Sequence, residues 1–312
     1  MLLKHLINPK PTIILFFSVS CLFFVLIPLF ESKLSVVFSH YFLNPIILLI
    51  SAVLIPFFLS VGLNNLVYEK NIIKKDNLVV GAVFILISSS FYNHIDTWVS
   101  AFILLFFFNF LVDSYQKEYP FSQLFNASLI LSSLTLVFPN LAYLSFLFIT
   151  NGIVFSHLNW RMFITIILGL LTPYLFYFGF TFLTEKHFII PDFFNINFIS
   201  FNNLLNLSLS KKIWIIILLI IIIFSFFELF LWLYKKSIKS RKIFITTFWY
   251  FIISLFIACC SNVNYFYFTL TPLTIIIGNY FVYSKKRKIA NILFFLLVIS
   301  SSYYKYMIAI NV

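Results

Sequence analysis

Charge and glycine are both scarce in this sequence. Only 10% of the 312 residues are charged and 6 are glycine, whereas about a quarter of the residues in an ordinary soluble domain are charged. The sequence has no glycine-rich phosphate loop, no paired Cys-x-x-Cys and no Gly-x-Ser-x-Gly elbow, which excludes the common soluble-enzyme motifs. So few glycines also argue against a channel built on close helix crossings.

Cysteine is scarce as well. Cys21, Cys259 and Cys260 all lie in apolar segments, and adjacent cysteines rarely bridge each other. We therefore predict no structural disulfide and no metal site.

Apolar and aromatic residues are abundant instead. Hydrophobic residues make up 62% of the chain and aromatic residues 21%, including 45 phenylalanines. A soluble globule of 36.7 kDa has too little interior to bury so much apolar surface, so much of it must face lipid. No polar stretch is long enough to form a water-soluble domain. The composition predicts an all-α polytopic membrane protein, with residues 1–312 in a single transmembrane domain.

The apolar residues fall into about eleven segments, each close to the roughly 20 residues that a helix needs to cross a bilayer. We expect the first to be a retained helix rather than a signal peptide, because no small-residue cleavage site follows it. The segments at 78–92, 97–113 and 141–156 are short, so each crosses a thinned or protein-buried region, is extended by interfacial aromatic residues, or dips in without crossing. The segments are 12–30, 44–64, 78–92, 97–113, 122–138, 141–156, 162–184, 212–234, 243–261, 264–283 and 289–306.

The positions of Lys and Arg predict the orientation. They lie in short runs between apolar segments, as in membrane loops, which argues against nucleic acid as a partner. With the N-terminus in the cytoplasm, 16 of the 21 fall in inner loops and 5 in outer loops. This bias predicts an N-in, C-out topology. The longest outer loop is then 185–211, whose mixture of Asn and Phe suits a segment lying at the membrane interface.

Three polar residues near the expected outer face are candidate catalytic groups. Glu31 follows the first span, and His94 and Asp96 lie in the tight turn between the third and fourth spans. Together they could supply a general base and an orienting group; the alternative is that they only solvate loop ends. On the inner side, Arg161 either binds a lipid phosphate through a bidentate hydrogen bond or, with Trp160, anchors a helix at the interface.

The segment from Asn159 to Tyr174, with Gly169 and Pro173, resembles the most recognisable part of a family of uncharacterised polytopic inner-membrane proteins of Bacteroidota. The Lys-rich N-terminus that ends in Asn8-Pro9-Lys10-Pro11 and the late aromatic segment from Tyr265 to Pro272 are similar to that family as well. The resemblance implies a multi-pass protein of a bacterial inner membrane and does not specify an activity.

A weaker resemblance is to polytopic glycosyltransferases that take sugars from polyprenyl-phosphate donors. Those enzymes carry a catalytic acid in the first outer loop, where Glu31 stands, and a second polar site in the next outer loop, where His94 and Asp96 stand. The resemblance implies that Glu31 is the base towards an acceptor hydroxyl, while Asp96 and His94 orient the acceptor or a metal. Its implied partner is a polyprenyl-phosphate-linked sugar. The first outer loop of this chain is shorter than in that family and lacks its Asp-Glu pair.

Three functions stay open from the sequence. The leading hypothesis is a protein of a cell-envelope pathway, in the form of a compact glycosyltransferase-like protein. The second is a non-catalytic subunit or scaffold that binds other membrane subunits, which fits the few buried polar groups. The third is a transporter or lipid flippase, which needs a water-accessible cavity lined by Asn, Ser and Glu228. No cofactor is specified by the sequence.

Overall fold

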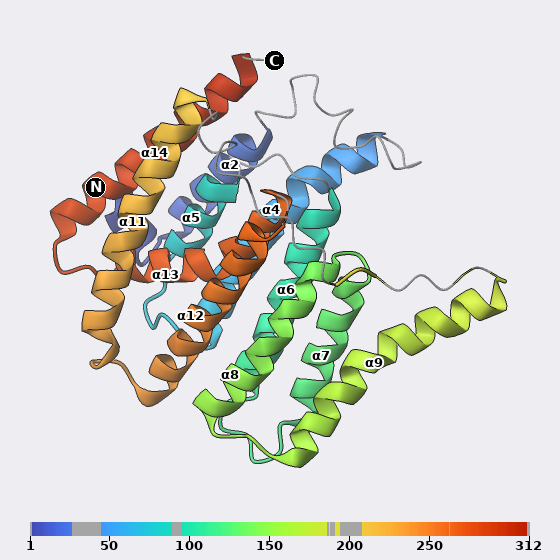
Figure 1. Cartoon of the computed structure of the whole chain (residues 1–312). Helices are drawn as coiled ribbons and strands as arrows, with labels where there is room; N and C mark the ends of the chain where they lie inside the picture. The colour runs from blue at the N-terminus through green and yellow to red at the C-terminus, as the bar shows by residue number, and fades with distance from the viewer. Residues whose placement is uncertain are drawn as a thin grey trace. The chain divides into compact units, whose positions relative to one another are not determined.

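The computed structural model describes residues 2–26, 45–88, 95–185, 187, 191–193, 208–261 and 263–310, and every regular element in these ranges is a helix (Figure 1). The elements are α1 (Leu2–Leu6), α2 (Pro11–Leu26), α4 (Pro45–Glu69), α5 (Val79–Ser88), α6 (Ile95–Asp113), α7 (Phe121–Thr135), the 3-10 helix η2 (Pro139–Ser145), α8 (Phe146–Phe155), α9 (Trp160–Leu183), α11 (Leu209–Leu233), α12 (Ile238–Cys259), the 3-10 helix η3 (Val263–Thr269), α13 (Leu270–Tyr283) and α14 (Arg287–Ile310).

Each apolar segment of the sequence contains helix, and the expected all-α fold is confirmed. Within the described residues, six helical stretches are long and apolar enough to cross a membrane, so the chain has several helices of membrane-spanning character. They are Asp96–Asp113, Trp160–Leu183, Leu209–Leu233, Ile238–Cys259, Phe266–Tyr283 and Arg287–Met307. The expected interfacial segment at 185–211 lies mostly outside the described residues.

In the described part of the short segment expected at 78–92, residues 79–88 form the 10-residue helix α5, in which every residue is buried. At about 1.5 Å per residue such a helix is about 15 Å long, half the thickness of the hydrocarbon layer. It packs against α4 and α13. This apolar run therefore faces protein on all sides, which hydropathy alone does not distinguish from a run that faces lipid.

The chain has two compact units, each assembled from segments that are not consecutive in sequence. Unit 1 comprises Met1–Val99, Ser200–Ser240 and Leu270–Val312, and unit 2 comprises Ser100–Ile199 and Arg241–Thr269. The structure therefore has two centres of packing, and the single transmembrane domain expected from the sequence stays a prediction.

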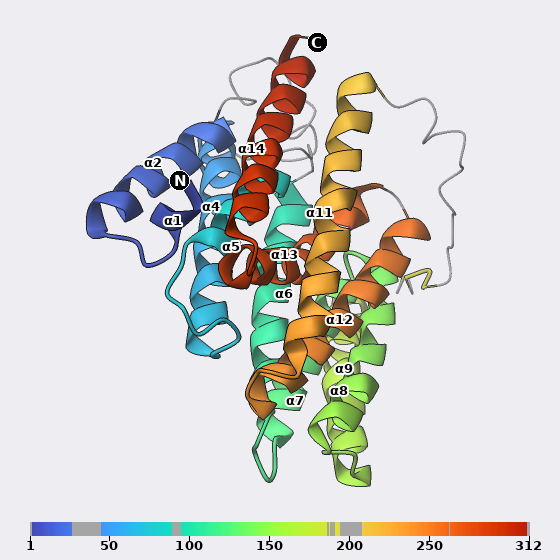
Figure 2. The same ribbon diagram turned by 90° about the vertical axis from the view of Figure 1, so that its left-hand side faces the viewer.

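In unit 1, α13 is the central helix, and residues Leu270–Val282 are all buried. Gly278 permits a close approach to α5, because a Cβ at this position would lie 2.6 Å from Cγ2 of Val80. α11 and α14 lie side by side (Figure 2). They are linked by Trp214, which donates from Nε1 to Oγ of Ser301 at 3.2 Å. The first and last helical segments also meet in unit 1, since α1 contacts α14.

In unit 2, the tightest helix pair is α7 with α9. Gly169 of α9 faces α7 so closely that a Cβ there would lie 2.9 Å from the carbonyl oxygen of Phe125. Nearby, the hydroxyl groups of Thr135 and Tyr174 share a hydrogen bond of 2.7 Å. Only 6% of the apolar span of α9 is buried, which is the exposure expected of a helix that faces lipid.

Candidate functional site

The N-terminal segment and the start of α14 enclose a basic hollow of about 680 Å³ in unit 1. Its wall carries three exposed cations, Lys4, Lys10 and Arg287, and the amide side chains of Asn8 and Asn291. None of the described residues that line the hollow is acidic. A concave surface lined by charge of one sign concentrates ligands of the opposite sign. The basic hollow is therefore suited to an anion.

An apolar cavity of about 500 Å³ adjoins the basic hollow. It runs along α2, and α5 and α14 complete its walls with residues such as Ile85 and Phe294. His5 and Ile13 line both the cavity and the hollow, so the two spaces lie next to each other. This pair of spaces has a cationic part and an apolar part. Its chemistry matches an amphipathic anion.

The N-terminal wall of the basic hollow is fixed by the loop between α4 and α5. The backbone N–H of Leu78 donates to the oxygen of Leu6 at 2.8 Å, and the N–H of Asn8 donates to the backbone oxygen of Asp76 at 2.9 Å. Asn8 has a φ of 55°, a left-handed conformation that Asn adopts more readily than most residues. This turn directs the chain from α1 into α2 and leaves Lys4 and Lys10 on the same hollow.

At the other end of the apolar cavity, Lys305 joins α14 to α2. Its Nζ donates to the backbone oxygen of Phe24, a residue that lines the cavity, and lies 3.9 Å from the centroid of the Phe24 ring. Phe24 lies in the last described turn of α2. Lys305 thereby links the two helices that border the cavity.

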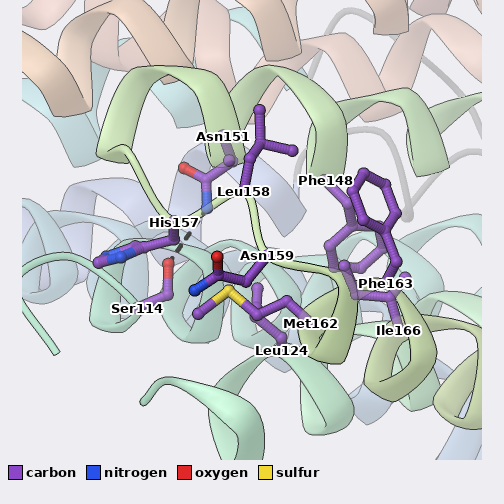
Figure 3. Close-up of a pocket in the computed structure, with 11 residues that line it drawn as sticks. Ser114, Leu124, Phe148, Asn151, His157, Leu158, Asn159, Met162, Phe163 and Ile166 are labelled. Carbon is purple, nitrogen blue, oxygen red and sulfur yellow. Dashed lines mark hydrogen bonds between the residues drawn. The ribbon is translucent and has the colours of Figure 1, made fainter. Parts of the chain in front are cut away.

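A second, much smaller pocket lies in unit 2 at the turn between α8 and α9 (Figure 3). Its volume of about 20 Å³ can hold a water molecule but not a substrate. Asn151 donates from Nδ2 to Oγ of Ser114 at 3.1 Å and accepts at Oδ1 from Oγ1 of Thr246 at 3.3 Å. These bonds connect α8 with the end of α6 and with α12.

His157 lies beside this small pocket (Figure 3). Burial lowers the pKa of its imidazole, a hydrogen bond to the backbone of Ser114 partly offsets that effect, and the positive charge of Lys242 lowers the pKa further. Its Nε2 is buried and makes no hydrogen bond to the described residues. The buried Nε2 and the water-sized space indicate a hydrogen-bonded contact between helices rather than a substrate site.

The structure describes one of the three predicted catalytic residues. Glu31 and His94 lie outside the described residues. Asp96 is half-buried in the first turn of α6, not in the turn before the helix as expected, because α6 already begins at Ile95. A carboxylate in this position is stabilised by the helix dipole. Catalysis by Glu31, His94 and Asp96 stays a prediction.

Arg161 is exposed in the first turn of α9, close to the small pocket in sequence but not among its lining residues. An exposed arginine at the start of an apolar helix fits both interpretations drawn from the sequence, lipid binding and interfacial anchoring. Lipid binding by Arg161 stays a prediction as well.

The basic hollow is not predicted from the sequence, although the sequence predicts on which side of the membrane each of its cations lies. Lys4, Lys10 and Arg287 all fall on the expected inner side. Nothing in the sequence shows that the first and last helical segments are neighbours, and only that contact brings the three cations to one hollow.

Comparison with known proteins adds no relative: no protein-family model, curated protein or solved structure matches this chain.

Proposed function

We propose that this chain is a multi-pass membrane protein that binds an anionic phospholipid in unit 1. One observation supports it: the basic hollow and the apolar cavity lie next to each other, with His5 and Ile13 lining both. The phosphate of a lipid fits the cationic end, and one acyl chain fits the apolar end. Each space lies within the range of about 300–1,000 Å³ that is usual for ligand pockets.

Arg287 is the cation best suited to the phosphate. Its guanidinium donates from Nη1 to the backbone oxygen of Phe281 at 3.4 Å, which orients the side chain at the start of α14. The remaining N–H groups form a planar fork that matches two phosphate oxygens. Lys4 and Lys10 add further positive charge. This favours a lipid with a net negative charge over a zwitterionic lipid, whose headgroup has no net charge.

We further propose about eleven crossings with the N-terminus in the cytoplasm of a bacterium. In unit 1, connectors expected on the inner side contact one another: Asn8 meets Asp76, and the N–H of Lys74 donates to the hydroxyl of Tyr283 at 3.0 Å. In unit 2, Asn140 and Ser261, both expected on the outer side, share a hydrogen bond of 2.6 Å. The basic hollow would then face the inner leaflet. A reporter fused to the C-terminus, expected outside the cytoplasm, tests this orientation.

Binding of a short-chain phosphatidylglycerol to the protein in a neutral detergent tests the lipid site. Arg287→Ala should weaken binding about fivefold, because a cation near an anionic headgroup contributes about 1 kcal/mol. Lys288→Ala is the matched control: it removes one exposed cation from the next residue, outside the hollow, and should leave the affinity unchanged.

Two ligand controls accompany these variants. Phosphatidylcholine with the same chains should bind more weakly because it has no net charge, and inorganic phosphate should bind more weakly because it has no chain. Equal affinity for the two lipids, or equal losses in the two variants, would contradict the proposal.

A further inference from the structure

We propose that Lys236 is a positioning residue for the lipid site, because it holds loop 70–78 against α13 and thereby fixes the N-terminal wall of the basic hollow. This inference rests on the proposed function, since it concerns how the same site keeps its shape.

The amine of Lys236 is the point where three parts of unit 1 meet. Lys236 lies in the turn between α11 and α12, and its Nζ donates to the backbone oxygen of Ile72 at 3.2 Å and to Oδ1 of Asn279 at 2.9 Å. The same atom lies 3.9 Å from the ring centroid of Trp232 and 5.3 Å from that of Tyr283. One side chain thus ties the loop to α13 and to the end of α11.

Two more hydrogen bonds hold this part of the loop. The N–H of Lys74 donates to the hydroxyl of Tyr283 at 3.0 Å, and Oγ of Ser240 donates to the backbone oxygen of Asn71 at 2.9 Å. The side chain of Ile73, between them, is fully buried. The position of the loop is therefore set on the α13 side.

The following residues of the loop connect this fixed part to the wall of the lipid site. Asn77 stiffens this stretch by donating from Nδ2 to the oxygen of Lys75 at 2.8 Å and accepting at Oδ1 from the N–H of Val79 at 3.1 Å. The backbone of Asp76 and Leu78 makes the two hydrogen bonds that hold the N-terminal segment. Only three residues lie between Ile72, whose oxygen Lys236 binds, and Asp76, which makes the first of these bonds, so a displaced loop would displace the wall.

Lysine suits this position because its amine can lose its charge. Burial and the nearby charge of Lys74 lower the pKa of the Lys236 amine to about 6. Near neutral pH the amine is then largely uncharged and still has N–H groups for both oxygen acceptors. A methionine has a similar apolar stem but no donor, so Lys236→Met removes the two hydrogen bonds and keeps most of the packing.

The phosphatidylglycerol titration, repeated on Lys236→Met and Lys235→Met, tests the inference. Lys235 is an exposed residue of the same turn, so its replacement makes the same change of residue type without touching the loop. Lys236→Met should weaken lipid binding about fivefold or more, the lower range of coupling between linked sites, and Lys235→Met should not. Hydrogen exchange at residues 70–78 should be faster in Lys236→Met, and Lys236→Arg, which restores N–H donors, should recover part of the affinity.

The outcomes separate this inference from the proposed function. If the wild-type chain does not bind phosphatidylglycerol, the lipid site itself is wrong. If it binds and Lys236→Met matches Lys235→Met in affinity, only the positioning role is wrong, even where loop exchange is faster. Should Lys236→Met fail to fold, Tyr283→Phe removes just the hydroxyl that accepts from Lys74; reduced lipid affinity supports the inference, and wild-type affinity overturns it.

Discussion

Lys236 and Lys305 each carry an amine into the interior of unit 1, and each amine donates to a backbone oxygen. Lys236 binds the oxygen of Ile72 and Lys305 that of Phe24. A buried amine without acceptors would be strongly destabilising. Both lysines therefore connect separate segments of unit 1, and both lie at borders of the proposed lipid site or of the loop that shapes it.

The lowered pKa of Lys236 predicts how stability depends on pH. The folded protein releases this proton near pH 6, whereas the unfolded chain keeps it up to about its ordinary pKa of 10.5. Between these values the unfolded state binds more protons, so this group makes stability rise with pH. The thermal unfolding midpoint in detergent should increase by several degrees from pH 6 to pH 8, at roughly 2–4 °C per kcal/mol. In Lys236→Met the midpoint should rise less between these two pH values. An equal rise would show that other groups cause the pH dependence of stability.

At the scale of the helix, α9 depends on one close contact with α7. Gly169→Ala would place a Cβ against the backbone of Phe125 and the side chain of Ser128, and such overpacking costs about 1–3 kcal/mol. Gly179→Ala, in the same helix with no atom within 4 Å of the added Cβ, is the matched control. Its unfolding midpoint should stay unchanged or rise slightly, because Ala favours helix over Gly. Equal effects of the two substitutions would contradict the close packing.

The positions of the helices could be predicted from the sequence, and their surroundings could not. Hydropathy marks apolar runs, and a helix lies in each of them. It does not show that α5 is enclosed by protein, or that residues 141–156 divide between the end of η2 and α8, since both depend on neighbours distant in the chain. The apolar run begins after Asp96, so the sequence predicts a turn at this residue, whereas α6 includes it.

For the whole molecule, the lipid site could not be found from the sequence because it joins the two ends of the chain. Lys10 precedes the first expected span and Arg287 precedes the last. An N-in topology puts both residues on the same side of the membrane, but it does not show that they are close to each other. Only the packing of α1 and α2 with α5 and α14 brings these cations to one hollow and puts an apolar cavity beside it.

The predicted glycosyl transfer at the outer face is independent of the lipid site and has its own test. Replacing Glu31, His94 and Asp96 together with Ala should abolish transfer from a lipid-linked sugar if Glu31 is the base. Envelope glycans and lipid-linked sugars, compared with wild type after membrane insertion is verified, give the answer. Unchanged glycans would show that the three residues have no catalytic role and only solvate loop ends. A scaffold or a transporter would then be the remaining hypotheses.

The most direct test of the central claim is photocrosslinking with a phosphatidylglycerol that carries a diazirine in one acyl chain. We expect crosslinked peptides to concentrate in residues 11–26 of α2 and 291–302 of α14, which border the apolar cavity. Excess unlabelled phosphatidylglycerol should abolish these crosslinks, whereas crosslinks on the lipid-facing helix α9 should decrease only in proportion to dilution. Equal labelling of α9 and α2, with the same response to competitor, would show bulk lipid contact and contradict the lipid site.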